Sequence, residues 1–569
     1  MMPKEIEDRI AEWESGPIDQ VSKAEIQTLR RDDPDKLMDA FYSTLSFGTG
    51  GMRGIMGVGS TRMNIYTIQM ATQGLANYLL LLQPKRDRHY VFIGYDCRNH
   101  SYEFAMQAAR VLAGNGIGVY LTFELRPTPY VSFGVRQKEC SAGIMITASH
   151  NSKEYNGYKV YWSDGAQVVA PHDKGIVEEA QKITKFDQIH LSVEKSPLIE
   201  IINPEFDFEY LEAIKKLQID KEQDQKVGDQ LKITYTSLHG TGIKLVPRAL
   251  RTFGFTNINL VDHQIVPDGN FPTVTHPNPE YAEALAMGIN QLVDTSSDIF
   301  IATDPDADRM AVVALHRDKS FTLSGNQIAI LCLEYICRTL QAQEKLPANG
   351  AAITTIVSTD LLSVIAKNYN IACFEVLTGF KYIGELIHKW EQDQSHQFLF
   401  GAEESYGYLM GTHSRDKDAI IASCLVAEIA LLMKVEGRTL VDFLEEIYKK
   451  YGLFYEQQKV LEFPPGHEGM KKMQQMMQLL RTASPKKIMG QDVTTIEDYQ
   501  SGLHGLPPSN VLLYRLADKS KIVVRPSGTE PKLKIYAAVQ EPTFENLDAG
   551  IATCQEKLQN LFNAVETLF

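Results

Sequence analysis

The chain has few cysteines, and their arrangement fits neither a disulfide framework nor a structural zinc site. Its 569 residues contain seven cysteines, an odd number, and no two of them form a Cys-x-x-Cys pair. Secreted disulfide scaffolds and zinc modules both need cysteines paired at characteristic spacings. The pattern therefore favours reduced thiols, and we expect a cytoplasmic protein.

Long apolar runs and an excess of positive charge are also missing. The N-terminal stretch MMPKEIEDRIAEWE is charged throughout and lacks the apolar segment of a signal peptide. The longest apolar segment, 419–433, contains Glu428 and is too short to cross a bilayer, so it predicts a buried helix. A formal net charge of -14 argues against nucleic acid or an anionic membrane as a partner. A small anionic ligand stays compatible, because a local cationic pocket can lie inside an acidic protein.

What the chain does contain is typical of a large α/β protein. Hydrophobic residues make up 44% and charged residues 22%, as in ordinary globular proteins. Strand-like apolar runs alternate with helix-length segments, which indicates βα units and mostly parallel sheets. The predicted strands cover 90–96, 118–122, 142–147, 231–236, 257–261, 298–303, 351–357, 373–377 and 397–400. At roughly 150 residues per domain we expect about four domains, covering 1–220, 221–322, 323–450 and 451–569.

A serine stands in the loop after the third predicted strand, in the sequence Thr-Ala-Ser-His-Asn at 147–151. Ligands of open α/β sheets gather at the carboxyl ends of strands, and a serine beside a histidine could act there as a nucleophile. The alternative is structural, because serine and asparagine also favour helix N-caps. On these five residues alone, Ser149 fits a cap better than a nucleophile.

Three aspartates, Asp304, Asp306 and Asp308, directly follow another buried strand. On an extended backbone these alternate positions point to one face, where their carboxylates repel one another unless a cation lies between them. Hard oxygen ligands at so few positions favour Mg²⁺ over a soft transition metal. The alternative is a solvated acidic turn. A calcium EF-hand is excluded, because the required glycine and glutamate do not follow.

Three further loops are ambiguous when taken singly. The segment 521–534 offers an arginine fork, hydroxyls and a glycine-permitted turn, as in a phosphate cradle, but also fits a plain Pro-Ser-Gly turn. Paired Glu403 and Glu404 could bind sugar hydroxyls or simply begin a solvated helix. The glycine-rich loop 47–54 carries Arg53 and could approach a ligand closely.

Together and in this order, the five loops resemble those of the α-D-phosphohexomutase superfamily. The text around Ser149, ITASHN followed by NGYKVYWSDGAQ, is most similar to the phosphoglucomutase branch, which also contains phosphopentomutases. The resemblance covers about 45 to 540. It implies a four-domain, heart-shaped α/β architecture, with three mixed α/β domains and a smaller α+β C-terminal domain. One departure is Ser152, where the family commonly has a proline that would stiffen the loop.

The resemblance also implies roles for individual residues. Ser149 would carry a phosphoryl group, and that phosphate together with Asp304, Asp306 and Asp308 would hold Mg²⁺. Lys159 matches the expected base if its pKa is lowered, with His150 as the alternative and Arg53 as a catalytic cation. The implied substrate-binding residues are Arg309, Thr378, Gly379, Glu403, Ser405 and Lys417, and the implied phosphate-binding residues are Arg525, Ser527, Gly528 and Thr529.

The implied reaction interconverts glucose 1-phosphate and glucose 6-phosphate, with glucose 1,6-bisphosphate as intermediate and activator. A phosphopentomutase or a glucose-1,6-bisphosphate synthase is the close alternative. An aspartate-nucleophile phosphatase also places Asp-x-Asp after a strand, and a non-catalytic paralogue could keep the fold. The expected partners are small phosphosugars, without nucleic acid or membrane, and the chain would be a monomer or homodimer.

Overall fold

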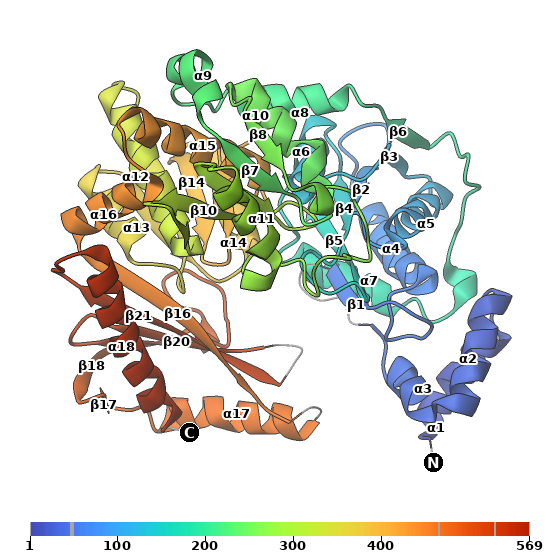
Figure 1. Ribbon diagram of the computed structural model, residues 1–569. Coiled ribbons are helices and arrows are strands. Elements are labelled where there is room, and N and C mark those ends of the chain that lie inside the picture. The colour runs from blue at the N-terminus through green and yellow to red at the C-terminus, as the bar shows by residue number, and fades with distance from the viewer. Residues whose placement is uncertain (1, 46–50, 465–466, 528–530, 568–569) are drawn as a thin grey trace. The chain divides into compact units, whose positions relative to one another are not determined.

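The computed structural model describes residues 2–45, 51–464, 467–527 and 531–567. Its described strands form four sheets (Figure 1). The first strand of each sheet lies in a different one of the four predicted domains. By contacts the chain divides into two compact units. The first combines 1–323 with 380–400 and 405–434, and the second combines 324–379 with 401–404 and 435–569. The predicted domain boundaries themselves stay a prediction.

The first unit begins with three helices and a six-stranded sheet. The helices are α1 (Lys4–Ser15), α2 (Gln20–Asp32) and α3 (Pro34–Phe41), followed later by α4 (Ile65–Leu80), α5 (Ser101–Gly114), α6 (Thr128–Gln137), α7 (His172–Gln181) and α8 (Phe206–Lys215). The strands are β1 (Gly51–Ile55), β2 (Tyr90–Tyr95), β3 (Gly118–Thr122), β4 (Ala142–Ile146), β5 (Tyr155–Trp162) and β6 (Ile199–Ile202), in the order β1-β5-β4-β2-β3-β6. Strands β2, β3, β4 and β6 are parallel, whereas β5 runs antiparallel to both β4 and β1.

Successive side chains of β2 point to opposite faces of the sheet, and helices pack against both faces. Val91 and Ile93 join a core with residues of α4 and α5. Their neighbours Phe92 and Gly94 lie against α6 on the other face. A Cβ on Gly94 would come within 2.5 Å of the Val131 side chain, so this close helix–strand contact requires glycine. A strand buried on both faces reads as a continuous apolar run, which is why the sequence predicted it well.

The same unit holds a second, five-stranded sheet in the order β11-β10-β9-β7-β8. Its strands are β7 (Ile233–Thr236), β8 (Ile258–Leu260), β9 (Ile299–Thr303), β10 (Met310–His316) and β11 (Lys319–Thr322), with helices α9 (Lys221–Val227), α10 (Val246–Phe253) and α11 (Ala282–Asp294). Strands β7, β8 and β9 are parallel, but β10 returns antiparallel to β9 with Thr303 opposite Met310. The aspartate segment is therefore a short hairpin connection. Helix α14 (Phe380–Asp393), strand β15 (Gly407–Met410) and helix α15 (Ala419–Val435) complete the unit.

The second unit contains a parallel strand pair and an antiparallel sheet. Strand β12 (Gly350–Thr355) pairs with β13 (Ala372–Val376), beside helices α12 (Gly325–Ala342), α13 (Leu361–Asn368) and α16 (Leu440–Tyr451). Strand β14 (Gln397–Glu403) passes from the first unit into the second. The antiparallel sheet has the order β16-β21-β20-β19-β18-β17, with α17 (His467–Thr482) and α18 (Leu547–Glu566) packed against it (Figure 1). Its strands are β16 (Leu453–Glu462), β17 (Lys487–Ile488), β18 (Gln491–Asp498), β19 (Leu512–Leu516), β20 (Lys521–Pro526) and β21 (Lys532–Glu541).

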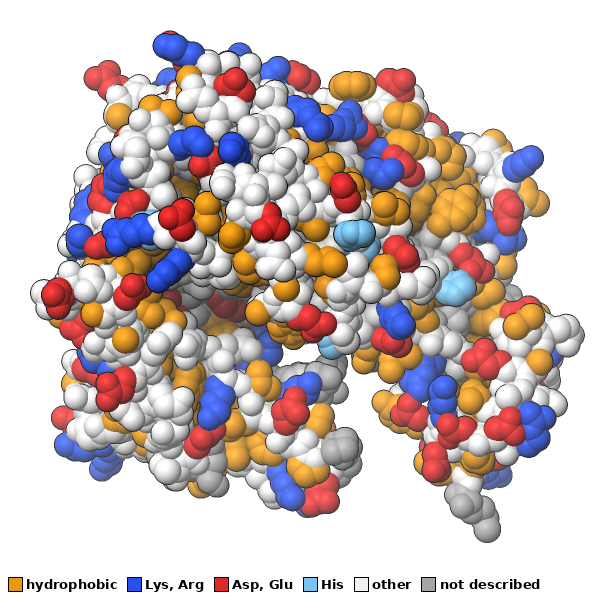
Figure 2. All heavy atoms as spheres, viewed as in Figure 1, with side chains coloured by type: hydrophobic (Ala, Val, Ile, Leu, Met, Phe, Trp, Pro, Cys, Tyr) orange, Lys and Arg blue, Asp and Glu red, His pale blue; other side chains and the backbone are white. Residues whose placement is uncertain are grey.

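Several composition-based expectations can be compared with this fold. The apolar segment at 419–433 is the buried helix α15, as predicted. Within the described ranges, every helix is too short or too polar to cross a bilayer. All seven cysteines are free thiols. On the face shown in Figure 2, acidic and basic side chains are interspersed rather than segregated by sign.

One buried carboxyl pair ties α15 to α9. Glu428 on α15 accepts the backbone N–H of Ile219 at 3.0 Å, and Asp224 on α9 accepts the side-chain amide of Gln218 at 2.7 Å. Both carboxyl groups are fully buried, and Asp224 Oδ1 and Glu428 Oε2 receive no hydrogen bond from a described residue. Burial and the neighbouring Asp224 raise the pKa of Glu428 well above its usual range, and burial raises that of Asp224 to about 6.

This pair predicts a pH-dependent stability. Both pKa values are raised on folding, so the contribution of each group is present at low pH. That of Asp224 is lost as the pH rises through about 6, and that of Glu428 is lost as the pH rises through its own raised pKa. Glu428→Gln supplies a permanent donor without a proton to lose. It should raise the thermal unfolding midpoint by roughly 1–3 °C at pH 8, with a smaller difference at pH 5. The control Glu436→Gln, at an exposed site past the end of α15, should shift both pH values by less than about 1 °C. A stabilisation by Glu428→Gln that is equal at the two pH values would contradict this account.

Candidate active site

Ser149 lies in a turn after β4 and caps no helix. Its φ angle is 52°, in the left-handed region that residues other than glycine rarely adopt. The Ser149 N–H donates to Thr147 Oγ1 at 2.8 Å, which fixes the turn locally. The cap interpretation of this serine is therefore wrong. A strained non-glycine residue at the end of a parallel strand is instead typical of functional loops.

The three aspartates converge through a turn and not through β alternation. Asp304 and Pro305 open the turn, a combination typical of its first two positions, and the Ala307 N–H returns to the Asp304 carbonyl at 2.9 Å. Ala307 has a φ of 49°, which bends the chain back. Asp304 Oδ1 then accepts the N–H groups of Asp308 and Arg309 at 3.1 and 3.0 Å. The extended backbone assumed from the sequence is wrong, although the predicted grouping of the carboxylates is correct.

The serine loop and the aspartate turn meet within the first unit. Ser149 Oγ donates to Asp304 Oδ2 at 2.8 Å, and one oxygen from each aspartate lies within 4.8 Å of the others. Asp304, Asp306 and Asp308 are 0%, 0% and 2% exposed. The alternative of a solvated acidic turn is therefore excluded by burial.

Two lysines supply positive charge to this cluster. Lys159, on β5, lies 2.7 Å from Asp306 Oδ2 and 3.2 Å from Asp308 Oδ2. Lys417, which follows β15, lies 3.2 Å from the same Asp308 oxygen. The stem of Lys417 passes directly over Gly407, where a Cβ would approach it to 2.1 Å. Glycine at 407 thus makes room for a cation that the sequence places ten residues away.

The donor set fits a divalent cation. Asp306 Oδ1 and Asp308 Oδ1 are buried, and no described residue donates a hydrogen bond to either. Such orphaned carboxylate oxygens are costly unless a cation binds them. All available ligands are hard oxygens, which Mg²⁺ prefers. Asp304, Asp306, Asp308 and the Ser149 side chain are the residues that would hold it.

The electrostatics of the cluster bear on proton transfer. Burial and the two neighbouring carboxylates raise the pKa of Asp304 well above its usual range. Burial acts to lower the pKa of Lys159, but Asp306 and Asp308 outweigh it and the pKa is raised. The lowered pKa that a lysine base needs is thus not found. Burial, with Arg309 and Arg53 nearby, lowers the pKa of His150, whose Nδ1 lies 3.1 Å from Ser149 Oγ.

The other predicted cations also surround the serine loop. Arg53 on β1 donates to Asn151 Oδ1 at 3.1 Å, because β1 pairs with β5 and places Arg53 opposite Gly157. Arg309 ends the aspartate turn and forms an ion pair with Glu280.

Ser405 lies in the turn before β15, next to Tyr406, whose carbonyl accepts the Met310 N–H at 3.0 Å.

The remaining predicted residues lie in the second unit. Glu403 ends β14, is buried, and accepts the N–H of Gly379 at 2.8 Å, so it does not begin a solvated helix. Gly379 has a φ of 122°, which only glycine adopts freely, and Thr378 stands directly before it. Arg525 is on β20, and the Ser527 N–H donates to the Lys532 carbonyl at 2.8 Å. Gly528, Thr529 and residues 47–50 of the glycine-rich loop lie outside the described residues.

Comparison with known proteins identifies the family. Models of the phosphoglucomutase/phosphomannomutase α/β/α domains I, II and III match residues 44–187, 208–317 and 324–451. A phosphoglucomutase of Staphylococcus haemolyticus is 38% identical over 530 residues, covering 90% of this chain and 93% of the relative. The chain belongs to the phosphoglucomutase/phosphomannomutase family. A phosphoglucomutase of Staphylococcus aureus is likewise 38% identical, over 90% of this chain and 92% of its own length.

Solved structures agree on the fold. The open form of pp63/parafusin, a phosphoglucomutase from Paramecium, has a TM-score of 0.68 at 19% identity, covering 91% of this chain and 95% of that one. A phosphoglucomutase/phosphomannomutase family protein from Burkholderia thailandensis has a TM-score of 0.67 at 18% identity, with 92% and 98% covered. The family models and the Staphylococcus relatives confirm the resemblance inferred from five loops and the mutase class of enzyme, and the solved structures agree with the α/β fold class.

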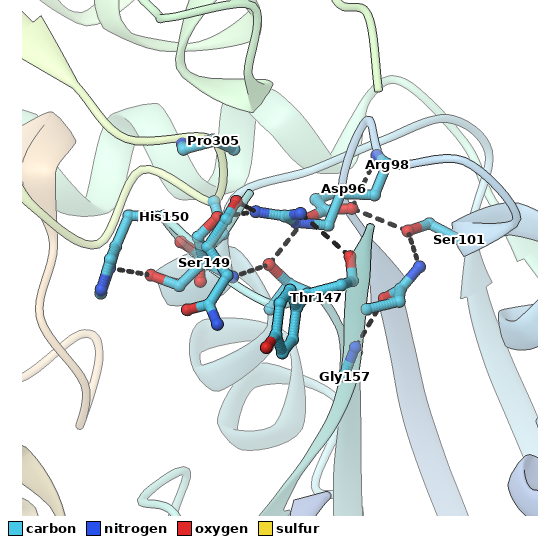
Figure 3. Close-up of polar contacts among 12 residues, drawn as sticks. Asp96, Arg98, Ser101, Thr147, Ser149, His150, Gly157 and Pro305 are labelled. Carbon is cyan, nitrogen blue, oxygen red and sulfur yellow. Dashed lines mark hydrogen bonds and ion pairs between the residues drawn. The ribbon is translucent and has the colours of Figure 1, made fainter. Parts of the chain in front are cut away.

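Several polar residues that contact the site residues were not predicted from the sequence. Thr128, at the start of α6, donates to Asp306 Oδ2 at 2.7 Å, and Asp416 lies 3.0 Å from the Lys417 ammonium. Asp96 and Arg98 follow β2 and contact the serine loop (Figure 3). Because β2 and β4 are adjacent parallel strands, the rule that ligand sites lie at strand carboxyl ends could have found this last pair.

Magnesium should stabilise the folded protein measurably. Saturating MgCl₂ should raise the thermal unfolding midpoint of the wild type by roughly 1–4 °C, because ligand binding to the native state adds free energy by mass action. Asp306→Asn, which keeps the shape but removes one anionic ligand, should lose most of this shift. The control Asp298→Asn removes a carboxylate that pairs with Lys434 just before β9, and should keep the shift. An undiminished magnesium effect in Asp306→Asn would show that the cation binds elsewhere.

Proposed function

We propose that this chain is a phosphoglucomutase that interconverts glucose 1-phosphate and glucose 6-phosphate through a phosphorylated Ser149. The observation that carries the proposal is the buried contact of Ser149 Oγ with Asp304, inside a carboxylate cluster that two lysines partly neutralise. The 38% identity to phosphoglucomutases over 90% of the chain supports glucose as the sugar.

In the forward half-reaction, the phosphoryl group leaves Ser149 Oγ for the free hydroxyl of the sugar phosphate. The P–Oγ bond breaks as the new P–O bond forms, and the sugar hydroxyl releases its proton to a basic side chain. Ser149 Oγ takes up a proton to become a hydroxyl again. Glucose 1,6-bisphosphate is the product of this half-reaction and, added from solution, the activator that rephosphorylates an empty serine.

In the return half-reaction, the bisphosphate has turned around and its other phosphate moves to Ser149. Arg525, Ser527, Gly528 and Thr529 would hold whichever phosphate is not reacting, and Thr378, Gly379, Glu403 and Ser405 would bind the sugar. Arg53, Arg309 and Lys417 contribute positive charge around the transferred group. Bound Mg²⁺ would neutralise charge on the phosphoryl oxygens. Catalysis then consists mainly of positioning and charge stabilisation, as phosphoryl transfer requires. We place the reaction in the cytoplasm, with a monomer or homodimer as the working unit.

The function is tested by a coupled assay of purified protein. Glucose 1-phosphate should be turned over fastest, and addition of glucose 1,6-bisphosphate should stimulate the rate. Faster turnover of ribose 1-phosphate would instead identify a phosphopentomutase, and net formation of the bisphosphate from a phosphoryl donor would identify a synthase. Mannose 1-phosphate serves as the hexose control. No turnover of any of the three sugars would refute the mutase proposal.

Ser149→Ala separates the mutase from the phosphatase alternative. Incubation of the wild type with labelled bisphosphate should give an acid-stable phosphoserine, whereas Ser149→Ala should incorporate no label and lose activity by at least about 10⁴-fold. The matched control is Ser152→Ala, three residues on in the same loop, which should keep the label. An acid-labile phosphate that persists in Ser149→Ala would indicate an aspartate nucleophile.

Lys159 and His150 are the two candidates for proton transfer. Loss of the group that moves the proton should lower kcat by about 10²–10⁴-fold, and loss of the other should cost much less. We expect Lys159→Ala to show the larger loss, because it removes both a proton-transfer candidate and the ammonium that pairs with Asp306 at 2.7 Å. Lys153→Ala, an exposed lysine of the same loop, should leave kcat unchanged. Near-normal turnover of Lys159→Ala would remove Lys159 from this role and leave His150.

A further inference from the structure

Arg98 holds the serine loop by its backbone. The guanidinium is completely buried, and its Nη1 donates to the carbonyls of Ser152 at 2.8 Å and Tyr155 at 3.0 Å. Its Nη2 donates to the carbonyl of Ser149 at 2.6 Å and also to that of Asn151. One side chain thus binds four carbonyls across the loop that follows β4. Because all four acceptors are carbonyl oxygens, Arg98 binds the backbone of the loop and not its side chains.

Asp96 fixes both the arginine and the start of the loop. Its Oδ1 accepts the Arg98 N–H at 2.9 Å and the Ser101 hydroxyl at 2.7 Å, and its Oδ2 lies 3.4 Å from Arg98 Nε. Oδ2 also accepts the Thr147 hydroxyl at 2.6 Å. Thr147 Oγ1 in turn accepts the Ser149 N–H, so a continuous chain of hydrogen bonds runs from Asp96 to the reactive serine. Figure 3 shows Arg98 and Thr147 on this network between Asp96 and Ser149.

The loop forms few backbone hydrogen bonds within itself. Between Ala148 and Tyr155, the described backbone–backbone bonds within the loop are Asn151 to Ala148 at 3.2 Å and Tyr155 to Ser152 at 3.1 Å. Ser149 is in the left-handed region, which persists only when surrounding contacts impose it. Ser152 stands where the family commonly has a stiffening proline, and its carbonyl is one of the four that Arg98 binds. The expected loosening is thus opposed by a side chain from the neighbouring strand end.

We propose that Arg98, held by Asp96, is a positioning residue that fixes Ser149 Oγ against Asp304 for phosphoryl transfer. The proposal rests on the proposed mutase function. Arg98 binds the backbone carbonyls of the loop, and we expect it to make no contact with the transferred group. Its effect should therefore fall on the rate of the chemical steps and leave sugar binding nearly unchanged.

Arginine is required here because of its geometry. The planar guanidinium directs several N–H groups to fixed points in one plane, whereas a lysine ammonium is a single point with three donors. Arg98 also stacks over the Phe271 ring, with 5.0 Å between its Cζ and the ring centroid. A lysine at this position keeps the charge beside Asp96 but cannot reach all four carbonyls at once. Arg98→Lys therefore keeps the positive charge of the side chain and changes the arrangement of its N–H donors.

The test compares Arg98→Lys with the wild type and with Arg110→Lys. Arg110 on α5 also donates to a backbone carbonyl, that of Ser192 at 3.0 Å, but away from the serine loop. We expect Arg98→Lys to lower kcat on glucose 1-phosphate by about 10²-fold with KM changed by less than about threefold, since small misplacements of a reacting group cost this much. Labelling of Ser149 by bisphosphate should slow by a similar factor. Arg110→Lys should match the wild type in both measurements.

Hydrogen exchange provides a readout that does not depend on turnover. In Arg98→Lys, backbone amides of 147–155 should exchange at least about tenfold faster, while those of β2 and β4 stay protected. Asp96→Asn, which keeps the volume of the side chain, should show a weaker form of the same pattern. If the wild type turns over no sugar phosphate, the proposed mutase function is refuted. The hydrogen-exchange result still shows whether Arg98 orders the loop.

Three results would overturn the positioning role. They are a kcat of Arg98→Lys within threefold of the wild type, a loss seen only in KM, and faster exchange spread evenly over the first sheet. The last pattern would mean that Arg98 serves overall stability. If Arg98→Lys does not fold, the Asp96→Asn comparison decides between the same outcomes.

Discussion

Three carboxylates buried side by side constrain the whole first unit. Asp304, Asp306 and Asp308 cannot be removed from water together without compensating charge. The compensating positive charge comes from Lys159, on β5 of the first sheet, and from Lys417, in the segment between β15 and α15. Segments more than a hundred residues apart are therefore held at one point. Ser149 lies at that point because β5, which carries Lys159, pairs with the strand that leads into the serine loop.

The site is also a place where the backbone is held in unfavourable conformations. Ser149 and Ala307 both have φ near 50°, and each turns its loop so that side chains point into the cluster. Such conformations persist only where neighbouring contacts impose them. The aspartate turn is held by its own Asp304 carboxylate, but the serine turn depends on Thr147 of its own loop and on Asp96 and Arg98 from the end of β2. The two loops are thus stabilised in different ways, one locally and one by tertiary contacts.

Much of this could be predicted from residue patterns. Strands buried on both faces give continuous apolar runs, so nearly all strands of the parallel sheets were located to within a few residues. The grouping of the aspartates followed from their alternate positions directly after a buried strand. The conformation of the aspartate segment did not, because an Asp-Pro turn and an extended strand both bring alternate carboxylates together. The supporting arginine was also missed, since Arg98 acts on carbonyls that any sequence possesses.

The sequence by itself determined the family, the α/β class and the grouping of the three aspartates, and it predicted Ser149 as the residue that carries the phosphoryl group. These depend on local motifs and on periodicity, which are properties of the chain in order. Only the tertiary structure decided that Ser149 is no helix cap, that its hydroxyl contacts Asp304, and that the environment of Lys159 raises its pKa. Burial and the distance between charges from remote segments set these properties. Neither quantity exists until the sheets pack and their strand ends meet.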